Sequence, residues 1–185
     1  MSTRDTILAA ALRVLEEEGE ARFSTRAVQT LANVTAPTVY HHFGNADGLL
    51  SAAIAEAFAQ FLASKKAAVS SPDPVTALRQ GWDDYVGFAA ARPRLYAAML
   101  GRVLAGIQIP AAEQGTALLM ASIRAVAAEG RLGVTVEAAT DQVWASANAA
   151  ALLHVTAQAR NASQPDQAVI DGLRDGAMQA VLTSK

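Results

Sequence analysis

The sequence predicts an all-α fold. Hydrophobic residues make up 52% of the 185 residues, and alanine, the best helix former, is used heavily. Apolar residues recur at helical spacing, and no run alternates apolar and polar residues as a strand would. Gly, Pro, Ser and Asn separate the periodic segments. These three observations predict about nine helices: three short ones, a long connecting helix and a larger helical body.

Three short helices are predicted in the first 45 residues. Thr3 can cap the first helix, and Gly19 is a natural stop for it. Ser24 can cap the second. Pro37 suits the first turn of the third, which Gly44 ends. The predicted first helix runs from its cap at Thr3 to Glu18, and the next two run from Thr25 to Leu31 and from Pro37 to Phe43.

A long fourth helix follows, capped by Asn45 and running to about Val69. The polar and proline-rich stretch from Ser70 to Pro74 breaks the chain. Further helices are expected at about 75–91, 93–104, 111–129, 136–160 and 166–183. We therefore divide the chain into a helix-turn-helix domain, 1–45, and a helical ligand-binding and dimerisation domain, 46–185, which begins with the connecting helix 46–69.

Composition excludes several classes of protein. The chain has no cysteine, so disulfides, thiolate metal sites and a cysteine nucleophile are excluded. The N-terminus is not a signal peptide, and we expect no membrane span, which needs 18 or more apolar residues. We see no catalytic triad spacing, phosphate loop or metal-ligand cluster. The expectation is a cytoplasmic protein that is not an enzyme and has no cofactor.

The stretch TAPTVYHHFGN, from Thr35 to Asn45, is the most informative in the sequence. Helix, tight turn and short helix form the layout of a helix-turn-helix. The hydroxyl, phenol and imidazole groups that remain outside its core suit phosphate oxygens and base edges. A metal pair at His41 and His42 is disfavoured, because adjacent helix residues do not face each other. The expected core is Val28, Leu31, Val34, Val39 and Phe43; the outward residues are Thr35, Thr38, Tyr40, His41 and His42.

The segment STRAVQTLANVTAPTVYHHF resembles the DNA-binding domain of the TetR/AcrR family of transcriptional regulators. This resemblance implies contacts from Tyr40 and His42 to the DNA backbone. It implies that Thr35, Ala36, Thr38 and His41 face the major groove, and that Ser24, Thr25 and Arg26 grip a phosphate at the start of the second helix.

Three positions depart from the family pattern. Asn33 replaces the usual glycine before the turn and tolerates the same positive φ. Gln29 replaces a small residue, and Ala46 replaces a lysine that usually contacts the backbone. Residues 1–50 hold four arginines against six acidic residues, which weakens phosphate attraction. A helical small-molecule-binding dimer that has lost specific DNA binding therefore stays open as an alternative.

The body of the chain is expected to hold a small-molecule pocket. The segment GWDDYVGFAAARPRLYAAML is similar to a tryptophan- and tyrosine-containing segment in the C-terminal domains of one branch of the family. Such a stripe is more often core, but buried amphipathic groups need polar partners and can anchor a ligand. The candidate ligand-binding residues are Trp82, Tyr85, Tyr96, Trp144, Asn148 and His154.

The last two helices carry alanine-rich apolar faces that permit close approach of helices. In the family, these helices pair with their copies in a four-helix bundle, so a homodimer is expected; alternatively, the faces close the monomer's own core. A two-fold dimer would match a palindromic DNA site. The resemblance implies a repressor that a small apolar or aromatic effector releases from double-stranded DNA.

Overall fold

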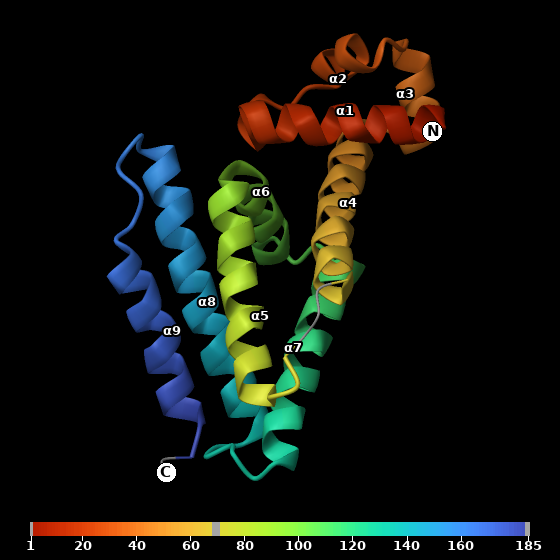
Figure 1. Ribbon diagram of the computed structural model, residues 1–185. Helices are drawn as coiled ribbons and strands as arrows, with labels where there is room; N and C mark the ends of the chain where they lie inside the picture. The colour runs from red at the N-terminus through yellow and green to blue at the C-terminus, as the bar shows by residue number, and fades with distance from the viewer. Residues whose placement is uncertain (1, 68–70, 184–185) are drawn as a thin grey trace. The chain divides into compact units, whose positions relative to one another are not determined.

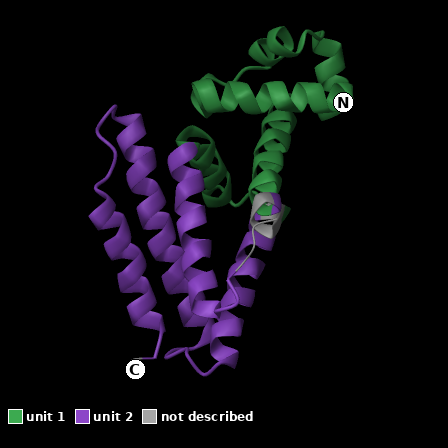
Figure 2. Cartoon of the chain, in the orientation of Figure 1, with its two compact units in different colours: residues 1–62, 92–111 green, residues 63–91, 112–185 purple. Residues whose placement is uncertain are grey.

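The computed structural model describes residues 2–67 and 71–183, and the all-α prediction is confirmed (Figure 1). Chain contacts divide the protein into two compact units, one of residues 1–62 and 92–111 and the other of residues 63–91 and 112–185 (Figure 2). The helices within the described ranges are α1 (Thr3–Glu18), a 3-10 turn (Glu20–Arg22), α2 (Thr25–Ala32), α3 (Ala36–Phe43), α4 (Ala46–Ala67), α5 (Pro74–Ala91), α6 (Pro93–Leu104), α7 (Pro110–Ala128), α8 (Val136–Ala159) and α9 (Gln167–Val181).

The ends of the first helices follow from local hydrogen bonding. Ser2, not the predicted Thr3, caps α1: its hydroxyl accepts from the Asp5 N–H, and the Asp5 carboxylate accepts from the Ser2 N–H. Ser24 caps α2 as predicted, accepting from the Ala27 N–H at 3.2 Å. The Asn45 carboxamide likewise accepts from the Gly48 N–H at 2.8 Å as α4 begins. The predicted last turn of that helix, to Val69, lies outside the described residues.

The turn between α2 and α3 depends on Asn33. Its φ of 53° and ψ of 49° are left-handed, a conformation that asparagine adopts more readily than most residues. The N–H groups of Asn33 and Val34 both bond to the Gln29 carbonyl, which closes the end of α2. The prediction of a positive φ at Asn33 is confirmed.

The core of this three-helix segment is smaller than predicted. Val28 and Val39 are fully buried, together with one face of α1. Leu31, however, is 43% exposed. It lies three residues after Val28, which is about 60° around the helix from the buried face, so its expected place in the core was wrong. Val34 and Phe43 are half-buried.

Helix α6 belongs to the same unit as α1 and contacts it through two arginines. Arg92 pairs with the Glu16 carboxylate, and Arg94 donates to the main-chain carbonyls of Glu16 and Glu17 at the end of α1. A cation at a helix C-terminus stabilises the unpaired carbonyls there. The first unit therefore consists of the helix-turn-helix segment, the part of α4 up to Leu62, and α6 joined to the end of α1.

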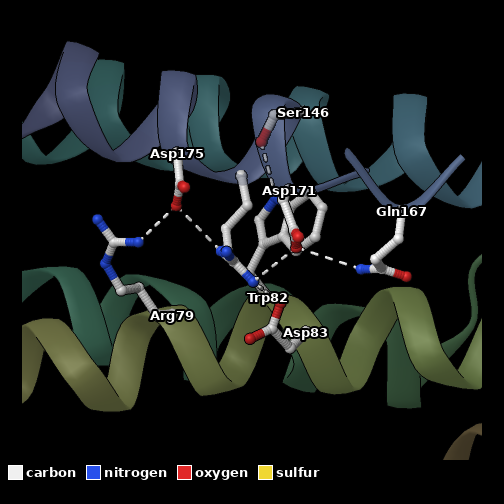
Figure 3. Close-up of polar contacts among 8 residues, drawn as sticks. Arg79, Trp82, Asp83, Ser146, Gln167, Asp171 and Asp175 are labelled. Carbon is white, nitrogen blue, oxygen red and sulfur yellow. Dashed lines mark hydrogen bonds and ion pairs between the residues drawn. The ribbon is translucent and has the colours of Figure 1, made fainter. Parts of the chain in front are cut away.

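In the second unit, α8 packs between α5 and α9 around a core that includes Leu78, Trp82, Ile123, Val143 and Met178. Polar contacts join α5 to α9 at its surface (Figure 3): Arg79 pairs with Asp175 at 2.6 Å, and Arg174 pairs with Asp83 at 3.0 Å. The Arg174 hydrogen bond lowers the pKa of the Asp175 carboxyl. These contacts fix the register of the two helices.

One helix passes a length and composition test for a membrane span, contrary to our expectation. The window Ala46–Ala63 of α4 has a mean hydropathy of 1.2, because alanine and larger apolar residues outweigh its two acidic residues. Within the protein, 39% of this window is buried, and core helices of soluble proteins pass the same test.

Candidate functional site

Helix α3 presents the polar surface that the sequence predicts. Tyr40 is 45% exposed, and Thr35 and His41 are exposed as well. Ala36, Thr38 and His42 are half-buried. The hydroxyls of Thr35 and Thr38 lie 2.9 Å apart and share a hydrogen bond at the start of the helix. The surface of α3 therefore offers hydroxyl, phenol and imidazole groups over its whole length.

The start of α2, which precedes α3 in the chain, carries a second set of polar groups. The Ser24 hydroxyl is engaged in capping, Thr25 is half-buried and Arg26 is exposed. The helix N-terminus and the Arg26 cation both favour an anion. These properties fit a phosphate contact in which Ser24 also holds the first turn in place.

Arg4 brings a further positive charge to the end of α3. Its guanidinium carbon lies 5.3 Å from the centroid of the Phe43 ring, a cation–π contact. The His42 ring packs edge-on against Phe43 at 6.3 Å between centroids, and His41 lies 5.2 Å from His42. The start of α1 and the end of α3 are thus joined around one phenyl ring.

The acidic residues of the first 50 positions find partners that the sequence did not indicate. Glu16 pairs with Arg92, and Asp47 pairs with Arg102 at 2.6 Å. With residues 92–111 included, the first unit holds seven arginines and seven acidic residues, so it is formally neutral. The net charge of residues 1–50 therefore overstates the repulsion that DNA would meet.

Among the predicted ligand-binding residues, Trp82 is part of the core of the second unit. It is 3% exposed, and its indole N–H donates to the Ser146 hydroxyl of α8 at 2.8 Å (Figure 3). Ser146 in turn donates to the Val143 carbonyl. The tryptophan therefore has a polar partner within the protein and does not need a ligand to supply one.

Two other predicted residues contact each other. The Tyr85 hydroxyl of α5 and the Asn148 carboxamide oxygen of α8 lie 3.1 Å apart, and Asn148 also donates to the Trp144 carbonyl at 2.8 Å. Trp144 is exposed, and His154 is hydrogen-bonded to Gln164 at 2.9 Å. Tyr96 is buried in the first unit. Tyr85 and Asn148 are thus brought together by hydrogen bonding.

A cavity of about 270 Å³ lies in the first unit, at residues that were not predicted to bind a ligand. It opens between α4 and the segment from α6 to the start of α7, and none of the six predicted ligand residues lines it. The feature of the sequence that could have indicated this cavity is Arg102, a cationic residue among apolar residues of a predicted helix. The lining residues are Ser51, Ala52, Ile54, Ala55, Arg102, Ile107, Gln108, Ile109 and Pro110.

Helices α8 and α9 each place some apolar residues in the core of the second unit and others at the surface. Ile170, Met178 and Val181 of α9 are buried in the second unit. Other apolar residues remain exposed on both helices, and neither Gly172 nor Gly176 has a neighbouring atom where a Cβ would stand. These helices therefore close the monomer's core and still present an apolar surface of small and large residues: Trp144, Ala145, Ala149, Leu152, Leu153, Val169 and Ala180.

Over residues 2–67 and 71–183, no group of three or more His, Asp or Glu side chains is placed to hold a metal ion. The site combines exposed polar side chains on α3 with the N-terminus of α2 and the arginines Arg4 and Arg26.

Comparison with known proteins finds relatives of the segment that contains this site. Residues 7–53 match the family model described as bacterial regulatory proteins, tetR family. A stretch of 89 residues is 34% identical to the HTH-type transcriptional repressor NicS of Pseudomonas putida, covering 45% of this chain and 42% of that protein. The matched stretch thus spans less than half the length of this relative.

Solved structures resemble the whole chain. A protein of unknown function from Rhodococcus sp. RHA1 has a TM-score of 0.83 at 23% identity, covering 99% of this chain and 97% of that one. A TetR transcription regulator from Haloarcula marismortui has a TM-score of 0.76 at 21% identity, covering 98% of each chain. Residues 7–53 are thus similar to the tetR family of bacterial regulatory proteins, and the fold of the whole chain is similar to that of these solved structures.

Proposed function

We propose that the chain is a DNA-binding transcriptional regulator that acts as a homodimer in the cytoplasm. One observation carries the proposal: the turn at Asn33 leads into a helix with exposed Thr35, Tyr40 and His41, inside the segment that matches the family model. A short helix of this kind, after a tight turn, fits the major groove of B-DNA.

The contacts divide by chemistry. Tyr40 and His42 donate to the DNA backbone, which positions the helix but carries no sequence information. Thr35, Ala36, Thr38 and His41 lie against base edges, where a threonine hydroxyl or methyl and an imidazole can discriminate between bases. Ser24, Thr25 and Arg26 hold a phosphate at the start of α2. Residues 1–45 form the DNA-binding domain in this proposal.

Dimerisation is supported by the exposed apolar surface of α8 and α9. Leu152, Leu153 and Val169 are large exposed hydrophobics on these helices. A second copy of the same surface would remove them from water, as an isologous interface does. The dimer would carry two α3 helices about one DNA turn apart, so the expected target is a palindrome. Residues 46–185 carry this interface and the effector site.

We further propose that the protein is a repressor which a small apolar or aromatic effector releases from DNA. The name of the Pseudomonas relative, a transcriptional repressor, supports the first part. An effector can shift DNA affinity only by binding the released conformation more tightly than the bound one. Tyr85 and Asn148, hydrogen-bonded between α5 and α8, are the predicted residues best placed to respond to it.

The direct experiment is selection of genomic DNA fragments by the purified protein, followed by footprinting of the recovered fragments. The proposal expects a protected palindrome with half-sites about one helical turn apart. Recovery of fragments without any shared site, by a folded dimer at physiological salt, would favour the alternative of a ligand-binding dimer without specific DNA binding.

A further inference from the structure

The cavity of the first unit has an apolar wall and a single buried cation. Ala52, Ile54 and Ala55 of α4 line one side, and Ile107 and Ile109 line the other. Arg102 supplies the charge, with its side chain only 8% exposed. The volume, about 270 Å³, lies just below the usual range of small-ligand pockets, which suits a ligand of few atoms.

Arg102 is held by three groups on two other elements, α4 and the 3-10 turn. Its guanidinium pairs with Asp47 of α4 at 2.6 Å, donates to the Ser51 hydroxyl at 3.0 Å and lies 4.0 Å from the Glu20 carboxylate. Asp47 and Glu20 are themselves well exposed, with side chains 73% and 44% accessible. The buried cation is therefore satisfied by carboxylates that keep their own access to water.

This arrangement allows exchange of one carboxylate for another. The Asp47 carboxylate loses little free energy by returning fully to water, because its side chain is already exposed. The buried Arg102 guanidinium, in contrast, needs an anionic partner. A guanidinium binds a carboxylate through two parallel hydrogen bonds. The apolar wall beside it would cover a short aliphatic or aromatic body, which fixes the chemical class of the ligand.

We propose that this cavity binds a small monocarboxylate with an apolar body, whose carboxylate takes the place of Asp47 at Arg102. The inference rests on the proposed function, because it gives the effector a chemical class and a site. It differs from the sequence-based expectation in placing the effector in the first unit and in giving it a negative charge.

Replacement of Asp47 by the ligand carboxylate would change the contacts that position the proposed DNA-binding helices. Asp47 lies in the first turn of α4, four residues after α3 ends at Phe43. Loss of its pairing with Arg102 leaves the Ser51 hydrogen bond as the remaining polar contact described here between Arg102 and α4, while Arg92 and Arg94 still join α6 to the end of α1. The ligand thus removes one of the contacts that set the position of α3 relative to α6, which is a differential interaction of the kind a population shift requires.

The test measures ligand binding without DNA, so it stands apart from the regulator proposal. Isothermal titration calorimetry of the full chain would use sodium benzoate and sodium hexanoate, with benzamide and hexanamide as neutral counterparts at matched salt. We expect at least one carboxylate to bind at least about tenfold more tightly than its amide, as loss of a charge-assisted hydrogen bond implies.

Two variants move the affinity in opposite directions. Arg102→Gln should weaken carboxylate binding at least about tenfold, and Asp47→Asn should tighten it about three- to tenfold by removing the competing anion. Arg124→Gln, at an exposed position on α7, is the matched control and should change nothing. If circular dichroism shows that Arg102→Gln does not fold, the Asp47→Asn variant still tests the proposal. Asp47 is exposed, so its substitution should leave the fold intact.

Four results would overturn the proposal. The first three are no binding of either carboxylate up to about 10 mM, equal binding of carboxylates and amides, or binding that Asp47→Asn leaves unchanged. Binding that survives Arg102→Gln and is lost in Asn148→Ala would likewise overturn it, by placing the ligand in the second unit. Failure of the regulator proposal shows separately, as absence of a specific DNA complex without ligand.

Discussion

Arg102 of α6 and Asp47 of α4 form an ion pair, with 2.6 Å between Nη2 and Oδ1, although 55 positions separate them in the sequence. The guanidinium hydrogen bond lowers the pKa of the Asp47 carboxyl. The pair joins the start of α4, which follows α3, to α6, and both residues lie in the first unit. In our proposal, this pair is the contact that an effector would break.

The start of α5 should make stability depend on pH. Asp73 accepts from the Thr76 hydroxyl and N–H at 2.6 and 2.8 Å and pairs with Arg131, which lowers its pKa from 3.8 to about 2. A depressed pKa in the folded state contributes stability that is complete above the unfolded value and is lost as pH falls towards about 2.

We therefore expect Asp73→Asn to lower the melting temperature at neutral pH and to flatten its decline between about pH 4 and pH 2. Circular dichroism melts across this range would measure both effects. Glu113→Gln, at an exposed position of α7, serves as the control. An unchanged pH profile in Asp73→Asn would contradict the assigned role.

The contact between Trp82 and Ser146 predicts a stability loss. Ser146→Ala leaves the buried indole N–H without its acceptor, which should cost about 1–3 kcal/mol in free energy of unfolding. Ser122→Ala is the matched control, because the Ser122 hydroxyl donates only within its own helix, to the Leu118 carbonyl. Urea titrations would measure the difference; equal stability of the two variants would refute the contact's importance.

The left-handed conformation of Asn33 predicts different effects on stability for substitution by alanine and by glycine. Asn33→Ala should destabilise the protein by about 1–2 kcal/mol, since alanine adopts this conformation poorly. Asn33→Gly should be close to neutral, because glycine has no Cβ to clash. Thermal unfolding followed by circular dichroism would compare them. A glycine variant as unstable as the alanine variant would show that the side chain, not the backbone angle, matters.

The exposed surface of α8 and α9 predicts the oligomeric state. Leu153→Glu would bury a charge in the proposed dimer interface and should raise the dissociation constant at least about tenfold. Leu118→Glu alters an equally exposed leucine of α7 and should leave the dimer intact. Sedimentation velocity over a concentration series would measure both. A wild-type chain that is monomeric throughout would contradict the interface.

The sequence predicts helices well here because their ends depend on local chemistry. The residues that end or begin these helices make their contacts within four positions of themselves in the sequence. They are Ser24, Asn45, Pro37 and Gly44, and each lies at a helix end in the structure. Asn33 could be assigned a positive φ for the same reason. The choice of Ser2 over Thr3 as the first cap differs by one position, because either hydroxyl could serve and only Ser2 forms the reciprocal bond with Asp5.

Contacts between distant segments were beyond prediction. Nothing in the pattern around Arg102 shows that its partners are Asp47, Ser51 and Glu20, since they lie on other helices. Leu31 has the right residue type for the core but the wrong angle around a short helix. The residues assigned to DNA and effector contact stay predictions, and their chemistry is what the experiments test.

Binding to the protein's own upstream intergenic DNA tests the account most directly. Mobility shifts at low and physiological salt would compare the wild type with Tyr40→Ala, which alters an exposed side chain and should leave the fold intact. We expect a specific complex with the wild type that weakens at least about tenfold in the variant. A folded dimer that forms no specific complex at either salt would contradict the assignment of this chain as a DNA-binding regulator.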